Sequence, residues 1–418
     1  IIYMTQQKLN KAIKYFEKAY KLNENFKEAY IQIALCNIQS NNYNKAIYIL
    51  NDVVKLFPNY TEAYLLKGDI HFGKLQMKEA IASYSNAIKI NPYNINAHLK
   101  KAILSFNIKD YNSCFYELKK ALCIDYGNSI FVEQKKEVLA MLNITSDNLY
   151  TKKIANDTLY EAYRKGVCFY VFGYYYDASL IFEDLLKIYD IYEINQLLGV
   201  IDYYLAEYDK SLLRFKRASE LNAESAFLYT NWGILYSVQG LKVKAAQQYI
   251  KALRLNENEP RIYYLLAKLN ESDNKIAAIN YLSKMIELNR NNPKIYEERA
   301  KLREEIGDYK GAAEDIEILI EYYPYNIKLY LQCADLNAKS GEYQLALDYI
   351  NLVVDKRGEN FNLLLMIANI YSLKGDQEEA IKFYKKTKLY RNSDYVDYCI
   401  GYSYQKLNQF EKAVRSYK

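Results

Sequence analysis

The stretch TEAYLLKGDIHFGKLQMKEAIASYSNAIKINPYN, residues 61–94, contains the pattern that decides the fold. Its eighth and twentieth positions are small, Gly68 and Ala80, and its fourth and twenty-fourth are aromatic, Tyr64 and Tyr84. Positions four, eight and eleven follow the spacing i, i+4, i+7, which places them on one face of an α-helix. The stretch therefore predicts two helices whose small residues allow a close approach.

The same pattern recurs along nearly the whole chain at a period of 33 or 34 residues. The windows that share it are 27–60, 61–94, 95–128, 159–191, 192–225, 226–259, 260–292, 293–326, 327–360 and 361–394, with a partial repeat before them and another at 394–418. Repetition at this period is typical of a solenoid, whose function lies on a surface built by stacking rather than in one pocket.

Turn residues separate the predicted helices at fixed places. Position fifteen is Gly in several windows and Asn41 in another, and both residue types tolerate the left-handed conformation that ends many helices. Pro260 and Pro293 begin predicted first helices, where a missing N–H costs little. Each window is thus expected to form helix, tight turn, helix, tight turn, and the fold class is predicted to be all-α.

These columns resemble the tetratricopeptide repeat family, whose pattern has aromatic residues at positions four and twenty-four and small residues at eight, twenty and twenty-seven. Window 61–94 meets the pattern with Tyr64, Gly68, Ala80, Tyr84, Ala87 and Pro92, and window 226–259 meets it nearly as well. The resemblance covers almost the whole chain except 129–158. It implies an α-solenoid of helix-turn-helix repeats that forms a right-handed superhelix with a concave groove, and a protein-binding role.

One interruption breaks the register of the repeats. Residues 129–158 lack the small residue at eight and the Ala at twenty, and the interpretations left open are a decayed repeat, a hinge and a partner-docking insertion. We predict an N-terminal array over 1–143, an irregular connection over 144–158 and a C-terminal array over 159–418. Neither end has a polar capping helix, so the chain is expected to be a section of a longer protein.

The sequence contains no recognisable catalytic or cofactor-binding motif. Its two histidines, His71 and His98, stand where other windows carry aromatic residues, so core packing is predicted for both. A Walker loop, G-x-G-x-x-G, H-E-x-x-H and C-x-x-C are all absent from the sequence. We therefore predict no catalytic residue, no cofactor and no metal, and expect that the chain is not an enzyme.

Charge and cysteine content restrict the partners and the compartment. The net charge is +6 with acidic and basic residues interleaved, which indicates a solvated surface rather than a nucleic-acid-binding one. No run of 18 apolar residues is present, so no membrane insertion is predicted. The six cysteines have no paired spacing, which fits a reducing compartment. An intracellular, cytoplasmic location is expected, with a ciliary or cytoskeletal assembly as a further option.

The resemblance implies that positions two, five, six, nine and twelve of the first helices line the groove. Members that clamp the C-terminal tail of a chaperone need Lys and Asn at several of these positions in successive repeats. No three successive windows offer that set, so chaperone tails are not expected as partners. A ladder of Asn at position six is also missing, because only Asn231 fits.

The groove positions change character along the chain. At positions five, nine and twelve they are apolar in the first half, apart from Asp69, and they become polar farther on, as at Glu297 and Lys301. An apolar stripe can receive the apolar face of a partner helix or an extended segment, although packing on the neighbouring first helix is the alternative interpretation. The predicted partner-binding residues are Ile31, Leu35, Ile38, Leu65, Phe72, Leu99, Ile103, Phe106, Tyr163, Val167, Tyr170 and Tyr203.

Together these features predict a non-catalytic protein–protein interaction scaffold. It would bind a partner helix or extended segment in its concave groove, within a large multiprotein assembly. The alternative is the substrate-recognition arm of an enzyme whose catalytic domain lies outside this chain, and the full-length open reading frame would distinguish the two.

Overall fold

The structure is a computed structural model, and it describes residues 8–23, 25–124 and 157–418. Every regular element within these ranges is an α-helix, apart from turns and bends. The chain separates into two compact units, residues 1–235 and 236–418, and the boundary falls inside one helix. The prediction of an all-α solenoid is confirmed.

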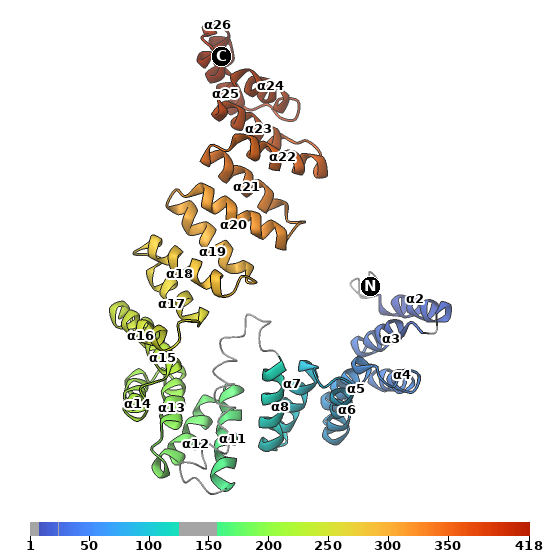
Figure 1. The fold of residues 1–418 in the computed structure, drawn as a ribbon. Helices are drawn as coiled ribbons and strands as arrows, with labels where there is room; N and C mark the ends of the chain where they lie inside the picture. The colour runs from blue at the N-terminus through green and yellow to red at the C-terminus, as the bar shows by residue number, and fades with distance from the viewer. Residues whose placement is uncertain (1–7, 24, 125–156) are drawn as a thin grey trace. The chain divides into compact units, whose positions relative to one another are not determined.

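The first unit consists of paired antiparallel helices that follow the predicted windows (Figure 1). Its helices are α2 (Leu9–Leu22), α3 (Lys27–Gln39), α4 (Tyr43–Leu56), α5 (Thr61–Gly73), α6 (Met77–Ile90), α7 (Ile95–Asn107), α8 (Tyr111–Ile124), α11 (Asp157–Val171), α12 (Tyr175–Ile188), α13 (Tyr192–Tyr204) and α14 (Tyr208–Leu221), and it includes the start of α15 (Ala226–Val238). In the windows 27–60, 61–94, 95–128, 159–191 and 192–225 the first and second helices pack against each other.

The second unit repeats the same plan. Its helices are α16 (Lys242–Leu255), α17 (Pro260–Asn270), α18 (Lys275–Leu288), α19 (Pro293–Glu305), α20 (Tyr309–Tyr322), α21 (Ile327–Ser340), α22 (Tyr343–Arg357), α23 (Phe361–Lys374), α24 (Gln377–Thr387), α25 (Asp394–Lys406) and α26 (Phe410–Tyr417). Pro260 and Pro293 occupy the first turns of α17 and α19, as predicted.

The small residue at position eight and the ring at position twenty-four pack directly on each other. A Cβ added at Gly68 would lie 2.3 Å from Cε1 of Tyr84, and one added at Gly199 would lie 2.5 Å from Cε1 of Phe215. Real Cβ atoms do not approach carbon that closely, so only glycine lets the ring reach the neighbouring backbone. Tyr84 and Phe215 are accordingly almost completely buried.

The residue at position fifteen adopts the predicted left-handed conformation in nine windows, including three where it is neither Gly nor Asn, whereas Asn274 has φ of −147°. Leu75, Lys109 and Ala206 have φ of 59°, 63° and 60°, close to the 58° of Asn41. The next residue closes the turn, since the N–H of Gln76 donates to the carbonyl of His71 at 2.9 Å. This bond pattern ends helices, so the turn imposes the left-handed conformation on residues that do not favour it.

Packing in the first unit continues from α8 directly to α11. The two helices contact each other, and Nη1 of Arg164 donates to Oδ1 of Asn112 at 2.8 Å. Windows 95–128 and 159–191 therefore meet as consecutive repeats do. Most of the predicted connection at 144–158 lies outside the described residues, while α11 already begins at Asp157. The division at 143 and the handedness of the superhelix stay predictions.

Candidate partner-binding surface

Six of the predicted groove residues lie on three successive first helices of the first unit. We call them the apolar wall: Leu35 and Ile38 on α3, Leu65 and Phe72 on α5, and Leu99 and Ile103 on α7. Helix α3 contacts α5, and Nζ of Lys100 on α7 lies 2.6 Å from Oδ1 of Asp69 on α5. The three helices are thus neighbours, and their wall residues share one register.

The apolar wall is partly accessible to solvent. Ile103 is 41% exposed, and the other five members are partly exposed. Four of the six also pack on a buried cluster: Leu35 and Ile38 on the core around Leu50, and Leu65 and Phe72 on the core around Tyr84. The wall therefore combines packing between repeats with an apolar surface, so the two sequence interpretations apply to the same residues.

Four predicted groove residues are buried. Ile31, Tyr163, Val167 and Tyr170 are 7%, 3%, 0% and 6% exposed. A partner could reach these side chains only if neighbouring repeats separated, because adjacent helices already cover them. Their role in partner binding stays a prediction, and packing is the role that their burial supports.

The two remaining predicted residues, Phe106 and Tyr203, belong to ring clusters at the turns between paired helices. Phe106 lies with its ring centroid 4.7 Å from that of Phe172 and 5.5 Å from that of Tyr174. The ring centroid of Tyr203 lies 5.3 Å from that of Tyr204. We call the full set the aromatic edge: Phe106, Tyr111, Phe169, Phe172, Tyr174, Tyr170, Tyr175, Tyr203, Tyr204 and Tyr208.

The first helices of the second unit carry ion pairs that join neighbouring repeats. Lys268 on α17 lies 3.2 Å from Glu298 on α19, and Lys339 on α21 lies 3.0 Å from Glu304. Glu297 and Lys301 on α19 are exposed, as the predicted gradient requires. The sequence showed the charged residues but not their partners, because each pair joins two repeats about 30 residues apart in the chain.

The two histidines differ from each other. His98 is buried, as predicted, and both of its ring nitrogens have polar partners. Its Nδ1 lies 2.6 Å from Oε2 of Glu117, and its Nε2 lies 3.0 Å from the carbonyl oxygen of Pro92. Lys101 lies 2.8 Å from the other oxygen of Glu117. His71 is only partly buried and contacts Gln76, so the prediction of core packing fails there because position eleven faces the turn in this repeat.

Asp202 on α13 is a buried carboxylate with incomplete pairing. It is 1% exposed, its Oδ2 accepts no hydrogen bond from any described residue, and Nε of Arg214 lies 3.9 Å away. Burial raises the pKa of Asp202 to about 6, against the opposing effect of Arg214 and with added repulsion from Glu183 and Glu207. Asp202 stands at position eleven of its window, where other windows carry aromatic residues. This departure from the repeat pattern could have identified the residue from the sequence, but it was not among the predicted sites.

Polar groups also occur on the first helices near the end of the first unit. Gln196 on α13 and Asn231 on α15 are 9% and 8% exposed, and Oε1 of Gln196 and Nδ2 of Asn231 lack a hydrogen-bond partner among the described residues. Their amides stand at positions five and six of consecutive first helices. A partner backbone could pair with them only after the side chains rotate toward solvent.

Two kinds of site, a metal centre and a membrane-spanning helix, are not found among the described residues. These residues contain no group of three or more His, Cys, Asp or Glu side chains placed to hold a metal ion. No helix within these ranges has both the length and the apolar character needed to cross a bilayer.

Comparisons with known proteins identify the repeat. A family model described as "Tetratricopeptide repeat" matches residues 3–70, and a second model with the same description matches 61–94 and 361–387. A search of curated proteins gave no match.

Several solved structures are similar to the chain at low identity. The C-terminal part of a tetratricopeptide repeat-containing protein from Cytophaga hutchinsonii has 21% identity and a TM-score of 0.41, covering 61% of this chain and 99% of its own. A tetratricopeptide repeat protein from Parabacteroides merdae has 20% identity and a TM-score of 0.37, covering 59% and 99%. Yeast Tom70 has 13% identity and a TM-score of 0.32, covering 94% and 91%. At these identities and scores the likenesses say nothing of a partner.

The family models and the packed repeat columns agree on the nature of the chain. The second model covers 61–94, where Gly68 packs on the ring of Tyr84 between the paired helices α5 and α6. The fold suggests a protein–protein interaction scaffold, and domains of this kind are generally non-catalytic. The chain therefore carries tetratricopeptide repeats, and its fold is an all-α solenoid.

Proposed function

We propose that the first unit binds an apolar segment of a partner protein, a helix or an extended strand, along the apolar wall. The observation that carries this proposal is the partial exposure of Leu35, Ile38, Leu65, Phe72, Leu99 and Ile103 on three neighbouring first helices. Burial of apolar surface favours protein–protein association, and each member of the wall still has surface to bury.

The size of the wall suits a short segment rather than a folded domain. Its residues recur at positions five, nine and twelve of successive repeats. A helical partner would therefore place about one apolar side chain per helical turn on the wall, and an extended partner would place every second side chain there. Asp69 and Lys100 lie beside the wall and pair with each other at 2.6 Å, so they form a polar rim. Such rims surround the anchoring residues of protein interfaces.

The second unit supports a role in assembly rather than the same kind of binding. Its first helices present the ion pairs Lys268–Glu298 and Lys339–Glu304 and the exposed Glu297 and Lys301. We propose that the chain acts as a scaffold in a multiprotein assembly and that an intracellular, reducing compartment keeps the five buried thiols of the described residues free.

A displayed peptide library selected on the purified chain tests the proposal. We expect the selected peptides to be rich in apolar residues, and we expect Leu65→Asp combined with Ile103→Asp to weaken them at least about tenfold, which corresponds to about 1.4 kcal/mol. The matched control is Tyr48→Asp, since Tyr48 is 68% exposed but lies on the second helix α4.

Two results of the peptide experiment would contradict binding at the apolar wall. Peptides that lose affinity equally in the control variant, or that keep it in the double variant while circular dichroism shows both folded, would place the binding surface elsewhere. The same peptides test the alternative that the chain is the substrate-recognition arm of an enzyme. Such an arm would select peptides that resemble the sequence around the substrate residue that the enzyme modifies.

A further inference from the structure

The repeats of the first unit share a register in which position ten of one window faces position twenty of the window before it. Ala46 and Ile70 belong to one buried cluster, and Ala80 and Leu104 belong to another. In each pair the smaller residue is at position twenty of a second helix and the larger is at position ten of the next first helix. The register is thus visible at two successive junctions.

At the next junction, between α8 and α11, both of these positions are cysteine. Cys114 occupies position twenty of window 95–128, and Cys168 occupies position ten of window 159–191. Both side chains are completely buried. The thiol of Cys168 donates to the carbonyl of Tyr111 at 3.6 Å, one turn before Cys114 on α8, and α8 packs on α11.

We propose that Cys114 and Cys168 are a site of oxidative modification, at which a hydroperoxide converts the two thiols into a disulfide that joins α8 to α11. With hydrogen peroxide, one sulfur attacks the peroxide oxygen, which forms a sulfenic acid and releases one water. The second sulfur then attacks the sulfenic sulfur, which forms the S–S bond and releases a second water. Two thiols are oxidised by two electrons, and one hydrogen peroxide is reduced to two waters.

Burial controls when the reaction can occur. Its neighbour Cys168, and then burial, raise the pKa of the Cys114 thiol, so the thiolate needed for attack is scarce while the helices are in contact. Oxidation must therefore follow a local separation of α8 from α11. Once formed, the bond holds these helices together and links the parts of the chain on either side of residues 125–156.

Peptide mapping of the intact chain tests the proposal. The purified protein is treated with hydrogen peroxide, free thiols are alkylated, and the protein is digested without reductant. We expect a linked peptide pair containing Cys114 and Cys168 that disappears on adding dithiothreitol. Hydrogen exchange should become slower in α8 and α11 after oxidation and return to its former rate after reduction.

Two variants control for burial and register. Cys36→Ser should leave the linkage unchanged: Cys36 also occupies position ten and is completely buried, but the register places Ala12, at position twenty, opposite it instead of a second thiol. Ala12→Cys should create a second linkage, to Cys36, by the same register. Cys114→Ser and Cys168→Ser should each abolish the original linkage.

Other results would overturn the proposal. Sulfinic acids on Cys114 and Cys168 without a linked peptide would show that the two sulfurs do not meet. Linkage of Cys114 to Cys123, Cys333 or Cys399 in preference to Cys168 would show that the oxidised species is unfolded. A folded Ala12→Cys variant that forms no bond with Cys36 would contradict the register itself.

Discussion

One junction between successive repeats of the first unit is made by stacked rings, and the matching junction of the second unit is made by an ion pair. Tyr175, the first residue of α12, stacks on Tyr204, the last residue of α13, with centroids 4.6 Å apart and planes inclined by 4°. At the same places in the second unit, Lys275 begins α18, Glu305 ends α19, and the two lie 3.0 Å apart. The same place in the repeat is therefore occupied by a pair of stacked rings in one unit and by an ion pair in the other.

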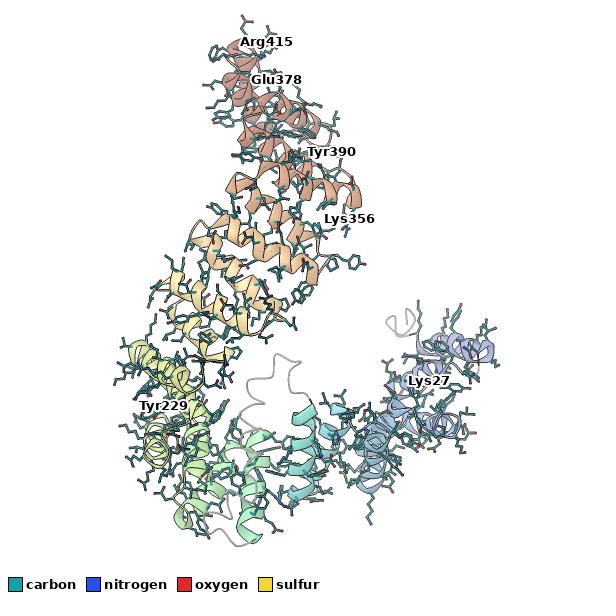
Figure 2. The ribbon with its side chains drawn as sticks, viewed as in Figure 1. Lys27, Tyr229, Lys356, Glu378, Tyr390 and Arg415 are labelled. Atoms are coloured by element: carbon teal, nitrogen blue, oxygen red, sulfur yellow. The ribbon has the colours of Figure 1, made fainter. Side chains whose placement is uncertain are left out.

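The difference shows that the repeat specifies where side chains meet but not how they attract each other. Stacked rings keep their attraction in salt, because it comes from dispersion and apolar burial. Exposed ion pairs are screened by salt and contribute little at ordinary ionic strength. Cation–π contacts occur in both units: Nζ of Lys27 lies 4.6 Å from the ring centroid of Tyr60, and Nζ of Lys356 lies 4.8 Å from that of Tyr330. Figure 2 labels the two lysines.

The units also differ in their buried carboxylates. Asp315 in the second unit is held by Arg299 at 2.5 and 3.0 Å and by Arg303 at 3.0 Å. Asp202 in the first unit has one arginine at 3.9 Å and an unpaired oxygen among the described residues. Both are 1% exposed, so the surroundings rather than the burial set them apart.

The largest expected effect is from Asp315→Ala. Removing this carboxylate leaves two guanidinium groups without their shared partner, so we expect the free energy of unfolding of the second unit to fall by about 3–5 kcal/mol. Urea denaturation followed by hydrogen exchange in α19 and α20 measures it. Glu304→Ala is the control, since its pair with Lys339 is at the surface and should cost below about 1 kcal/mol. Equal losses in both variants would contradict the account.

Asp202→Asn should raise the free energy of unfolding, whereas Asp315→Ala should lower it. Because the pKa of Asp202 is about 6 in the folded chain, against an ordinary value of 3.8, the folded form binds more protons and its stability falls as pH rises from about 4 to about 6. The neutral amide avoids this loss, so we expect the variant to be more stable than the natural chain at pH 7, by up to about 3 kcal/mol.

A pH series of thermal melts checks the prediction for Asp202. The natural chain should lose stability between about pH 4 and pH 6 in excess of the variant, and the two curves should run parallel above pH 7. The charged groups that share this site are Arg214, Glu183, Glu207 and Lys210, so Glu183→Gln serves as a control that should lower the pKa of Asp202 and shift the window down. Identical slopes in the natural chain and in Asp202→Asn would sink the assignment.

The smallest effect is a salt test of the repeat contacts themselves. We expect Tyr204→Ala to lower stability by about 1–2 kcal/mol at any salt concentration, because it removes a stacked ring. Glu305→Ala should cost about 0.5 kcal/mol at low salt and nothing measurable at about 1 M salt, since its ion pair with Lys275 is screened. Thermal melts at both salt concentrations distinguish the two, and a salt-sensitive Tyr204→Ala would break the comparison.

Much of the fold could be predicted because its determinants are local. The pairing of Gly68 with Tyr84 and the prolines that begin α17 and α19 were both expected from spacing. The left-handed Leu75 and Ala206 were not, since their residue types do not favour that conformation and only the closed turn imposes it. The six members of the apolar wall were named from the sequence, but their partial exposure could not be.

The sequence by itself determined the all-α repeat, its period and its paired helices, because small and aromatic residues at i, i+4 spacing act within one window. Tertiary structure alone decided that Tyr163, Val167 and Tyr170 are buried while Ile103 is exposed. It also decided that α8, which carries Cys114, packs on α11, which carries Cys168. The physical reason is that a residue's exposure and partners depend on the repeats stacked beside it, which no single window contains.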